Sequence, residues 1–112
     1  MMLLTKAIIK RTPDLRATDG QGDDAIVQAK FFHPMSNWTW FLLELEKDDT
    51  DPRGITGVAF GLVSGHEIEL GAFDMHELET VRVHGLGIER DMYWDPRPLS
   101  EVRKSLEERR WA

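Results

Sequence analysis

The sequence predicts an α+β domain over residues 1–112, with a mainly antiparallel sheet of about four strands. A short N-terminal helix and two C-terminal helices are expected to pack on this sheet. Two observations predict the class. Aromatic and β-branched runs separated by turn residues fill the middle of the chain, and capped segments with helical apolar spacing lie near its ends. At 112 residues the chain is long enough for one hydrophobic core and too short for two domains.

The first helix is predicted directly after Thr5, whose hydroxyl suits an N-cap. Leu4 and Ile9 have the spacing of a hydrophobic staple around that cap. Pro13 ends the helix, because its ring disfavours helical backbone at the preceding residue. The polar segment 17–24 then predicts a loop.

Two aromatic-rich strands are predicted at about 26–33 and 38–46, joined by Pro34–Asn37. Strict alternation divides the second strand between two faces: Thr39, Phe41, Leu43 and Leu45 on one, and Trp38, Trp40, Leu42, Glu44 and Glu46 on the other. The first set can form a core. The second set suits either another buried layer or a binding surface. We expect a helix to cover Trp38 and Trp40, with an exposed aromatic strip as the alternative.

A hairpin is predicted from 58–63 and 67–73, turning at Ser64-Gly65. Pairing Val63 with His66 would place Ala59, Gly61 and Val63 on one face with Ile68, Leu70 and Ala72. A four-residue loop would keep the same faces. On the opposite face, Glu69 would then lie across from Phe60.

Asp74 and Glu77 form a capping-box pattern that predicts the second helix. The apolar residues expected to face inward from it are Met75, Leu78 and Val81. Residues 83–98 read as a long connection, and a connection of that length is often functional. A final helix over about 99–110 has a narrow apolar stripe of Leu99, Val102 and Leu106.

The net charge of −6 is concentrated in the middle of the chain, where residues 17–88 hold thirteen acids against four basic residues. This negative region disfavours direct nucleic-acid binding. The chain has no cysteine, which predicts a reducing cytoplasm and excludes disulfides and thiolate metal sites. No apolar run has membrane-spanning length, and the apolar N-terminal segment is too short and too interrupted by lysine for a secretory signal.

Several side chains are candidates for a functional site. The candidate binding residues are Trp38, Trp40, Glu44, Glu46, Glu89, Arg90, Asp91, Tyr93 and Trp94. Of these, Arg90 is the best candidate for binding an anion, although a structural ion pair is the more common role of such an arginine. Weak metal candidates are His66, Glu67, Glu69 and His76, with His76 and Glu79 spaced to chelate together on a helix. None has an established metal-ligand spacing, so we expect neither a metal nor a cofactor.

Paired carboxylates are another possibility. Glu44 and Glu46 would lie about 7 Å apart on one strand face, and Glu67 and Glu69 repeat this spacing. If these strands adjoined, the four acids could crowd together and raise one pKa. Solvent-exposed strand faces carry such pairs more often than active sites do.

Five motifs, in order, resemble a bacterial family of small single-domain proteins known only as a domain of unknown function. They are Lys30–Pro34, Asn37–Trp40, Phe60–Gly65, Glu69–Gly71 and Ile88–Asp91. The resemblance extends from Leu3 to Glu101. It implies a fold type and a frequent location on plasmids, phages and other mobile elements, but no activity and no catalytic residues.

Three functional hypotheses follow. The favoured one is a small cytoplasmic, non-catalytic accessory protein that binds a protein partner through the segment Ile88–Trp94 and a Glu44/Glu46 edge. The first alternative is a metal-dependent hydrolase or nuclease that uses a carboxylate/histidine cluster. The second is an acidic inhibitor of host restriction or defence enzymes. The oligomeric state is not predicted.

Overall fold

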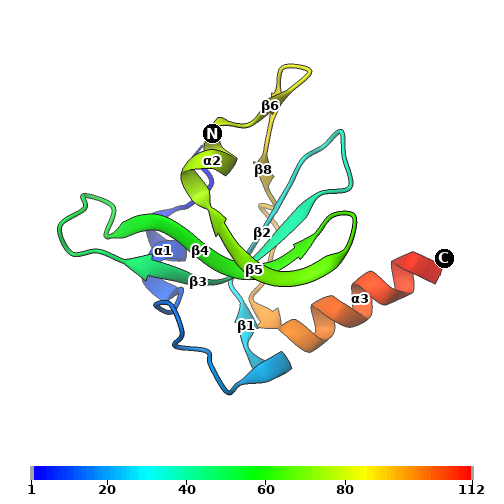
Figure 1. Ribbon diagram of the computed structural model, residues 1–112, viewed down its shortest axis with the longest axis horizontal. Helices are drawn as coiled ribbons and strands as arrows, with labels where there is room; N and C mark the ends of the chain where they lie inside the picture. Colours follow the sequence, from blue (N-terminus) through cyan, green and yellow to red (C-terminus); the bar gives the residue numbers. More distant parts are fainter. Residues whose placement is uncertain (1, 112) are drawn as a thin grey trace.

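A computed structural model describes residues 2–111 and has the predicted α+β architecture, with a five-stranded antiparallel sheet and three α-helices (Figure 1). Side chains are described as far as Arg109. The helical elements are α1 (Lys6–Arg11), the 3-10 turn η1 (Gly22–Asp24), α2 (Met75–Thr80) and α3 (Leu99–Trp111). The strands are β1 (Ile26–Val27), β2 (Ala29–Phe32), β3 (Thr39–Lys47), β4 (Ile55–Ser64), β5 (Ile68–Asp74), β6 (Arg82–Val83), β7 (Leu86–Gly87), β8 (Glu89–Arg90) and β9 (Arg97–Pro98).

The predicted helix boundaries are confirmed at their caps. The hydroxyl of Thr5 accepts from the backbone N–H of Ile8 at 3.1 Å, and α1 ends one residue before Thr12. The Asp74 carboxylate accepts from the N–H of His76 at 2.7 Å, which begins α2. These short polar side chains satisfy N–H groups that have no partner within the helix, so local sequence is enough to locate both starts.

The main sheet has the order β5-β4-β3-β2-β8, with all neighbours antiparallel. The prediction of about four strands was therefore one short. The fifth strand, β8, pairs with Phe31 and Phe32 and comes from the segment 83–98, which the sequence presented as a loop. Two paired residues are too few to produce a periodic sequence signal. Within the same segment, β6 and β7 form a small hairpin, and β9 pairs with β1.

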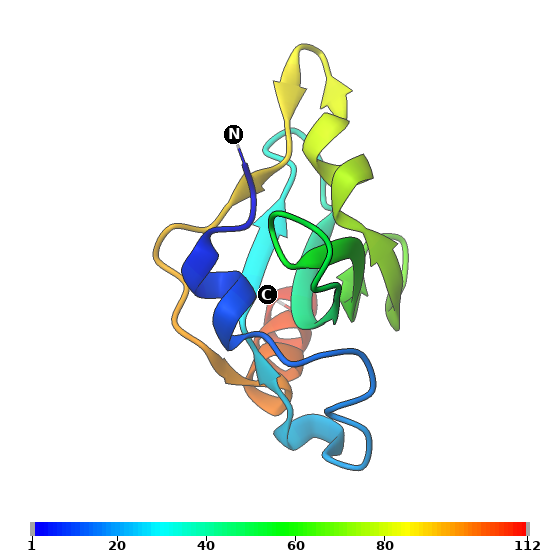
Figure 2. The ribbon, with the colours of Figure 1, turned by 90° about the vertical axis from the view of Figure 1, so that its left-hand side faces the viewer.

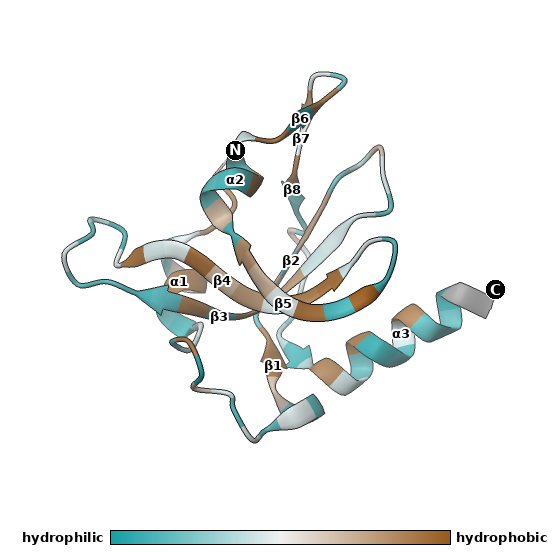
Figure 3. Cartoon of the chain, in the orientation of Figure 1, coloured by the Kyte–Doolittle hydropathy of each residue, from teal (hydrophilic) through white to brown (hydrophobic). Residues whose placement is uncertain are grey.

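Each face of the sheet has its own hydrophobic core. The first core joins Leu3, Leu4 and Ile8 from the N-terminal segment, Phe31 and Leu42 from the sheet, and Met75 and Leu78 from α2. The second core joins Val27, Phe41, Leu43 and Leu62 to Leu99 and Val102 of α3. Figure 2 shows α1 near the viewer and α3 farther away, and Figure 3 shows apolar residues concentrated along the central strands. Helices thus cover parts of both sheet faces.

A bulge in β3 overturns the strict alternation predicted for this strand. The pairing with β4 shifts between Leu42 and Glu44, which leaves Leu43 as an extra residue. As a consequence Phe41 and Leu43 lie in the second core, whereas Leu45 joins Leu42 in the first. An extra residue reverses the side-chain faces that follow it, so the predicted grouping of Leu45 with Leu43 was wrong.

The β4–β5 hairpin is confirmed, but its predicted register was wrong. Val63 pairs with Glu69 rather than with His66, and Ser64 pairs with Ile68. The connecting loop therefore has an odd number of residues, Gly65 to Glu67, and is closed by a hydrogen bond from Gly65 N–H to the Glu67 carbonyl at 2.9 Å. An odd loop exchanges the two faces of β5, so Phe60 faces Ala72, and Glu69 belongs to the Val63 side.

Candidate functional site

Trp38, Trp40 and His66 form an aromatic strip beside the first core, which Trp40 contacts. The two indole rings stack with centroids 6.1 Å apart, and the imidazole of His66 meets Trp38 edge-on at 5.7 Å. Trp40 is half-buried and packs against the core, whereas Trp38 is 38% exposed. The predicted burial therefore holds in part for Trp40 and was wrong for Trp38. Gly65 permits this arrangement, because a Cβ there would lie 2.6 Å from Cε3 of Trp38.

Two carboxylates, Glu67 and Glu69, border the aromatic strip and form an acidic pair. Glu69 follows Val63 and Trp40 across the sheet, and a shallow hollow is lined by Trp38, Val63, His66, Glu67 and Glu69. A hydrogen bond to Glu67 raises the pKa of Glu69, and repulsion from the same carboxylate raises it further. Both side chains are exposed. A bound cation would relieve the repulsion between them.

Glu44 does not lie on a surface edge with Glu46, as the sequence suggested. Its side chain is 3% exposed, and its carboxylate accepts from Arg16 N–H at 2.8 Å, from Thr18 N–H at 3.0 Å and from the Thr18 hydroxyl. Glu46 is half-buried and accepts from the hydroxyl of Thr56 at 2.7 Å. The two carboxylates therefore bond to different parts of the chain. Glu44 anchors the loop after α1, and Glu46 bridges to β4.

The candidates on the segment 88–94 also divide between structural and exposed roles. Ile88 is buried, and Trp94 donates its indole N–H to the Val27 carbonyl at 3.0 Å, so Trp94 holds this segment against the rest of the protein. Tyr93 is 92% exposed and does not share that role. Asp91 accepts from Tyr93 N–H at 2.9 Å, and Glu89 is exposed.

Arg90 holds the N-terminal segment in place. Its guanidinium donates to the carbonyls of Met2 and Leu3 at 3.2 and 3.0 Å, and it contacts the sulfur of Met92 at 3.3 Å. Among the described residues it makes no ion pair with Glu89 or Asp91. These bonds fix the chain just where Leu3 and Leu4 enter the first core.

Arg90→Ala should therefore lower the free energy of unfolding by about 1–2 kcal/mol, because two hydrogen bonds from a charged group are lost. Urea unfolding followed by tryptophan fluorescence measures this change. Glu89→Ala is the control, since its side chain is exposed on the same short strand. Equal midpoints for the two variants would show that Arg90 does not anchor the N-terminal segment.

The weak metal candidates are not brought together. The His76 ring lies 3.1 Å from the Thr56 carbonyl, and Glu79 pairs with Arg53 at 3.3 Å, so His76 and Glu79 do not chelate jointly. Among the residues that the structure describes, no group of three His, Asp or Glu side chains is placed to hold a metal. Glu44 and Glu46 also have their own partners, and the proposed four-acid cluster does not form around Glu67 and Glu69.

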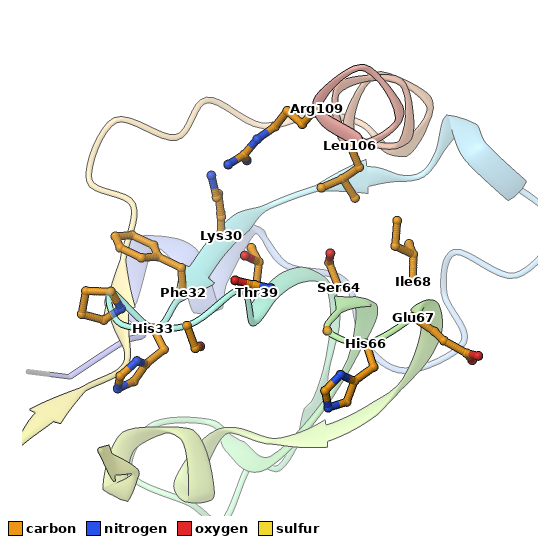
Figure 4. A pocket seen from close by; sticks show the side chains of 14 residues that line it. Lys30, Phe32, His33, Thr39, Ser64, His66, Glu67, Ile68, Leu106 and Arg109 are labelled. Carbon is orange, nitrogen blue, oxygen red and sulfur yellow. The ribbon is translucent and has the colours of Figure 1, made fainter. Parts of the chain in front are cut away.

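A polar cleft lies on the opposite sheet face, and sequence reasoning missed it. It has a volume of about 670 Å³ and opens between the β2–β3 loop, the β4–β5 loop and the end of α3 (Figure 4). Its lining residues include Lys30, Phe32, His33, Thr39, Ser64, Glu67 and Arg109. Lys30 and Arg109 come from distant parts of the chain, so no local motif links them.

The chain matches a family described as "Protein of unknown function (DUF2958)" over residues 3–108. It belongs to this family. The DUF2958 match confirms the resemblance given by the five motifs, and the association with mobile elements stays a prediction. No curated protein and no solved structure matches this DUF2958 chain. Of the helices described for this family member, none has both the length and the apolar composition needed to span a lipid bilayer.

Proposed function

We propose that this chain is a cytoplasmic protein-binding module without catalytic activity, which holds a basic segment of its partner on the aromatic strip. The observation that carries the proposal is the exposed ring of Trp38, stacked on Trp40 and bordered by two carboxylates. Large aromatic side chains with a solvent-exposed face are typical anchors of protein interfaces. The candidates Trp38 and Trp40 are thus retained, and Glu67 and Glu69 replace the buried Glu44 and the half-buried Glu46 as the acidic component.

The chemistry of the strip favours a lysine or arginine from the partner. Indole faces attract cations, and the Glu67–Glu69 pair attracts the same charge. The aliphatic stem of a lysine or arginine can cover the exposed ring of Trp38 while its charged end reaches the carboxylates. One basic side chain therefore satisfies both halves of the site.

The same charges argue against a nucleic-acid ligand at this surface. A base-stacking platform is normally bordered by lysine and arginine, which bind the phosphate backbone. Here the strip is bordered by Glu67 and Glu69, and the whole chain carries a net charge of −6. A protein inhibitor that covers a basic, nucleic-acid-binding surface of a host enzyme would use these same contacts, and this keeps the defence-inhibitor hypothesis within the proposal.

Trp38→Ala should weaken partner binding about 30-fold, because the loss of a central aromatic anchor costs about 2 kcal/mol. The measurement is nuclease-treated affinity capture from bacterial lysate, with the captured protein then titrated against each purified variant. Tyr93→Ala is the matched control, since it removes an exposed aromatic ring away from the strip. Glu67→Gln with Glu69→Gln should weaken the same complex and reduce its salt dependence.

Binding should also weaken as the pH falls through the raised pKa of Glu69, because the protonated carboxyl no longer attracts a basic group. Equal affinity for the parent and the Trp38→Ala variant would contradict the proposal. So would a complex that disappears on nuclease treatment, or one that the Glu67 and Glu69 substitutions strengthen.

A further inference from the structure

The polar cleft occupies the part of the second sheet face that α3 leaves uncovered. One row of residues crosses four strands there: Phe32 pairs with Thr39, Thr39 with Ser64, and Ser64 with Ile68. Leu106 of α3 borders this row (Figure 4). The row therefore forms a floor with one aromatic ring and two hydroxyls.

Two cations meet at the α3 side of the cleft. Lys30 rises from β2 and Arg109 descends from α3, and their charged ends point toward one another in Figure 4. The two side chains also line a smaller adjoining hollow together with Arg97 and Glu101. No carboxylate of the described residues lies within ion-pair distance of Lys30 or Arg109. Like charges brought together without an ion-paired carboxylate favour the binding of an anion.

The other titratable groups of the cleft leave this positive end open. Glu67 lies at the far rim, and Figure 4 shows its side chain directed away from the two cations. His33 accepts from Met35 N–H at Nδ1 and therefore carries its proton on Nε2, which lies 3.1 Å from the Leu86 carbonyl. With both ring nitrogens engaged in this way, His33 forms part of the cleft wall. His66 contacts Trp38 edge-on and lies across the cleft from the two cations in Figure 4.

We propose that this cleft binds a small phosphate-bearing molecule, with the phosphate between Lys30 and Arg109. Arginine offers a planar fork to phosphate oxygens and lysine a compact charge, a combination common in phosphate sites. The hydroxyls of Thr39 and Ser64 and the ring of Phe32 are placed to contact the rest of the ligand. The net charge of −6 disfavours an extended polyanion but not a small one, which selects a free phosphate ester over nucleic acid. This inference does not rest on the protein-binding proposal.

The test is isothermal titration calorimetry of the full chain at low salt with three probes: AMP, inorganic pyrophosphate and citrate. AMP or pyrophosphate should bind, and Lys30→Gln and Arg109→Gln should each raise the dissociation constant about tenfold or more. Lys104→Gln removes an exposed lysine from the same helix as Arg109 and should leave binding unchanged. If AMP binds more tightly than pyrophosphate, the nucleoside part of AMP adds contacts. We would assign these contacts to Phe32 and to the hydroxyls of Thr39 and Ser64.

Amide chemical-shift mapping on the parent protein provides a test that needs no variant. AMP should shift residues 36–39 and 64–67, on the two loops that border the cleft. The proposal is overturned if neither phosphate probe binds, if only citrate binds, or if the shifts fall elsewhere. It is also overturned if correctly folded Lys30→Gln and Arg109→Gln proteins bind AMP as the parent does.

Discussion

Gly61→Ala should destabilise the protein strongly, with a loss of about 3–4 kcal/mol in the free energy of unfolding. Gly61 lies on β4 opposite Leu42, next to the bulge in β3. A Cβ at this position would overlap the carbonyl oxygen of Phe41 and lie 2.9 Å from its carbonyl carbon. Both atoms belong to the backbone of a strand held by neighbours on either side, so they cannot move without disturbing the sheet.

Gly71→Ala is the matched control for this substitution. Gly71 pairs directly with Gly61 on the next strand, yet a Cβ there would meet nothing within 4 Å. The two variants make the same chemical change in adjacent strands and differ in the space available. Urea unfolding should show a midpoint near that of the parent for Gly71→Ala and a large decrease for Gly61→Ala. Equal midpoints would mean that β3 and β4 do not approach closely at the bulge.

Glu44→Ala should lower the free energy of unfolding by about 3 kcal/mol, because it leaves three donors without their acceptor. The N–H groups of Arg16 and Thr18 and the hydroxyl of Thr18 all donate to this buried carboxylate. Arg16 has a φ of 69°, a left-handed conformation that a non-glycine residue adopts only when its surroundings hold it there. Without the carboxylate, no described side chain accepts from the N–H groups of Arg16 and Thr18, and we expect the loop after α1 to leave this conformation.

Glu46→Ala is the control, since it removes a half-buried glutamate from the same strand with a single described hydrogen bond, to Thr56. We expect it to cost less than about 1 kcal/mol. Hydrogen exchange at Arg16 and Thr18 should accelerate in Glu44→Ala and not in Glu46→Ala. Unchanged exchange at these amides would show that the carboxylate does not hold the loop.

The sequence predicted only part of the candidate site, because the remaining part depends on long-range packing and on strand register. Trp38 and Trp40 were recognised as an aromatic strip, but whether a helix covers them depends on where helices distant in sequence pack. The predicted acidic edge was Glu44 with Glu46 rather than Glu67 with Glu69, because one extra residue in β3 and an odd loop after β4 each reverse a strand face. The sequence marked Arg90 as a candidate by its charge. Its hydrogen bonds to the Met2 and Leu3 carbonyls join residues that are far apart in the chain, so no local pattern predicts them.

Local sequence was enough to predict the α+β class, the caps at Thr5 and Asp74, the β4–β5 hairpin, the apolar stripe of α3 and the family. These features depend on neighbouring residues, whose spacing and side-chain chemistry act over a few positions. Four features follow from long-range packing instead: the β3 bulge, the edge strand β8, the burial of Glu44 and the position of Lys30 and Arg109 in one cleft. Each of these depends on the packing of segments that are far apart in the chain, and local patterns do not encode the register in which such segments meet.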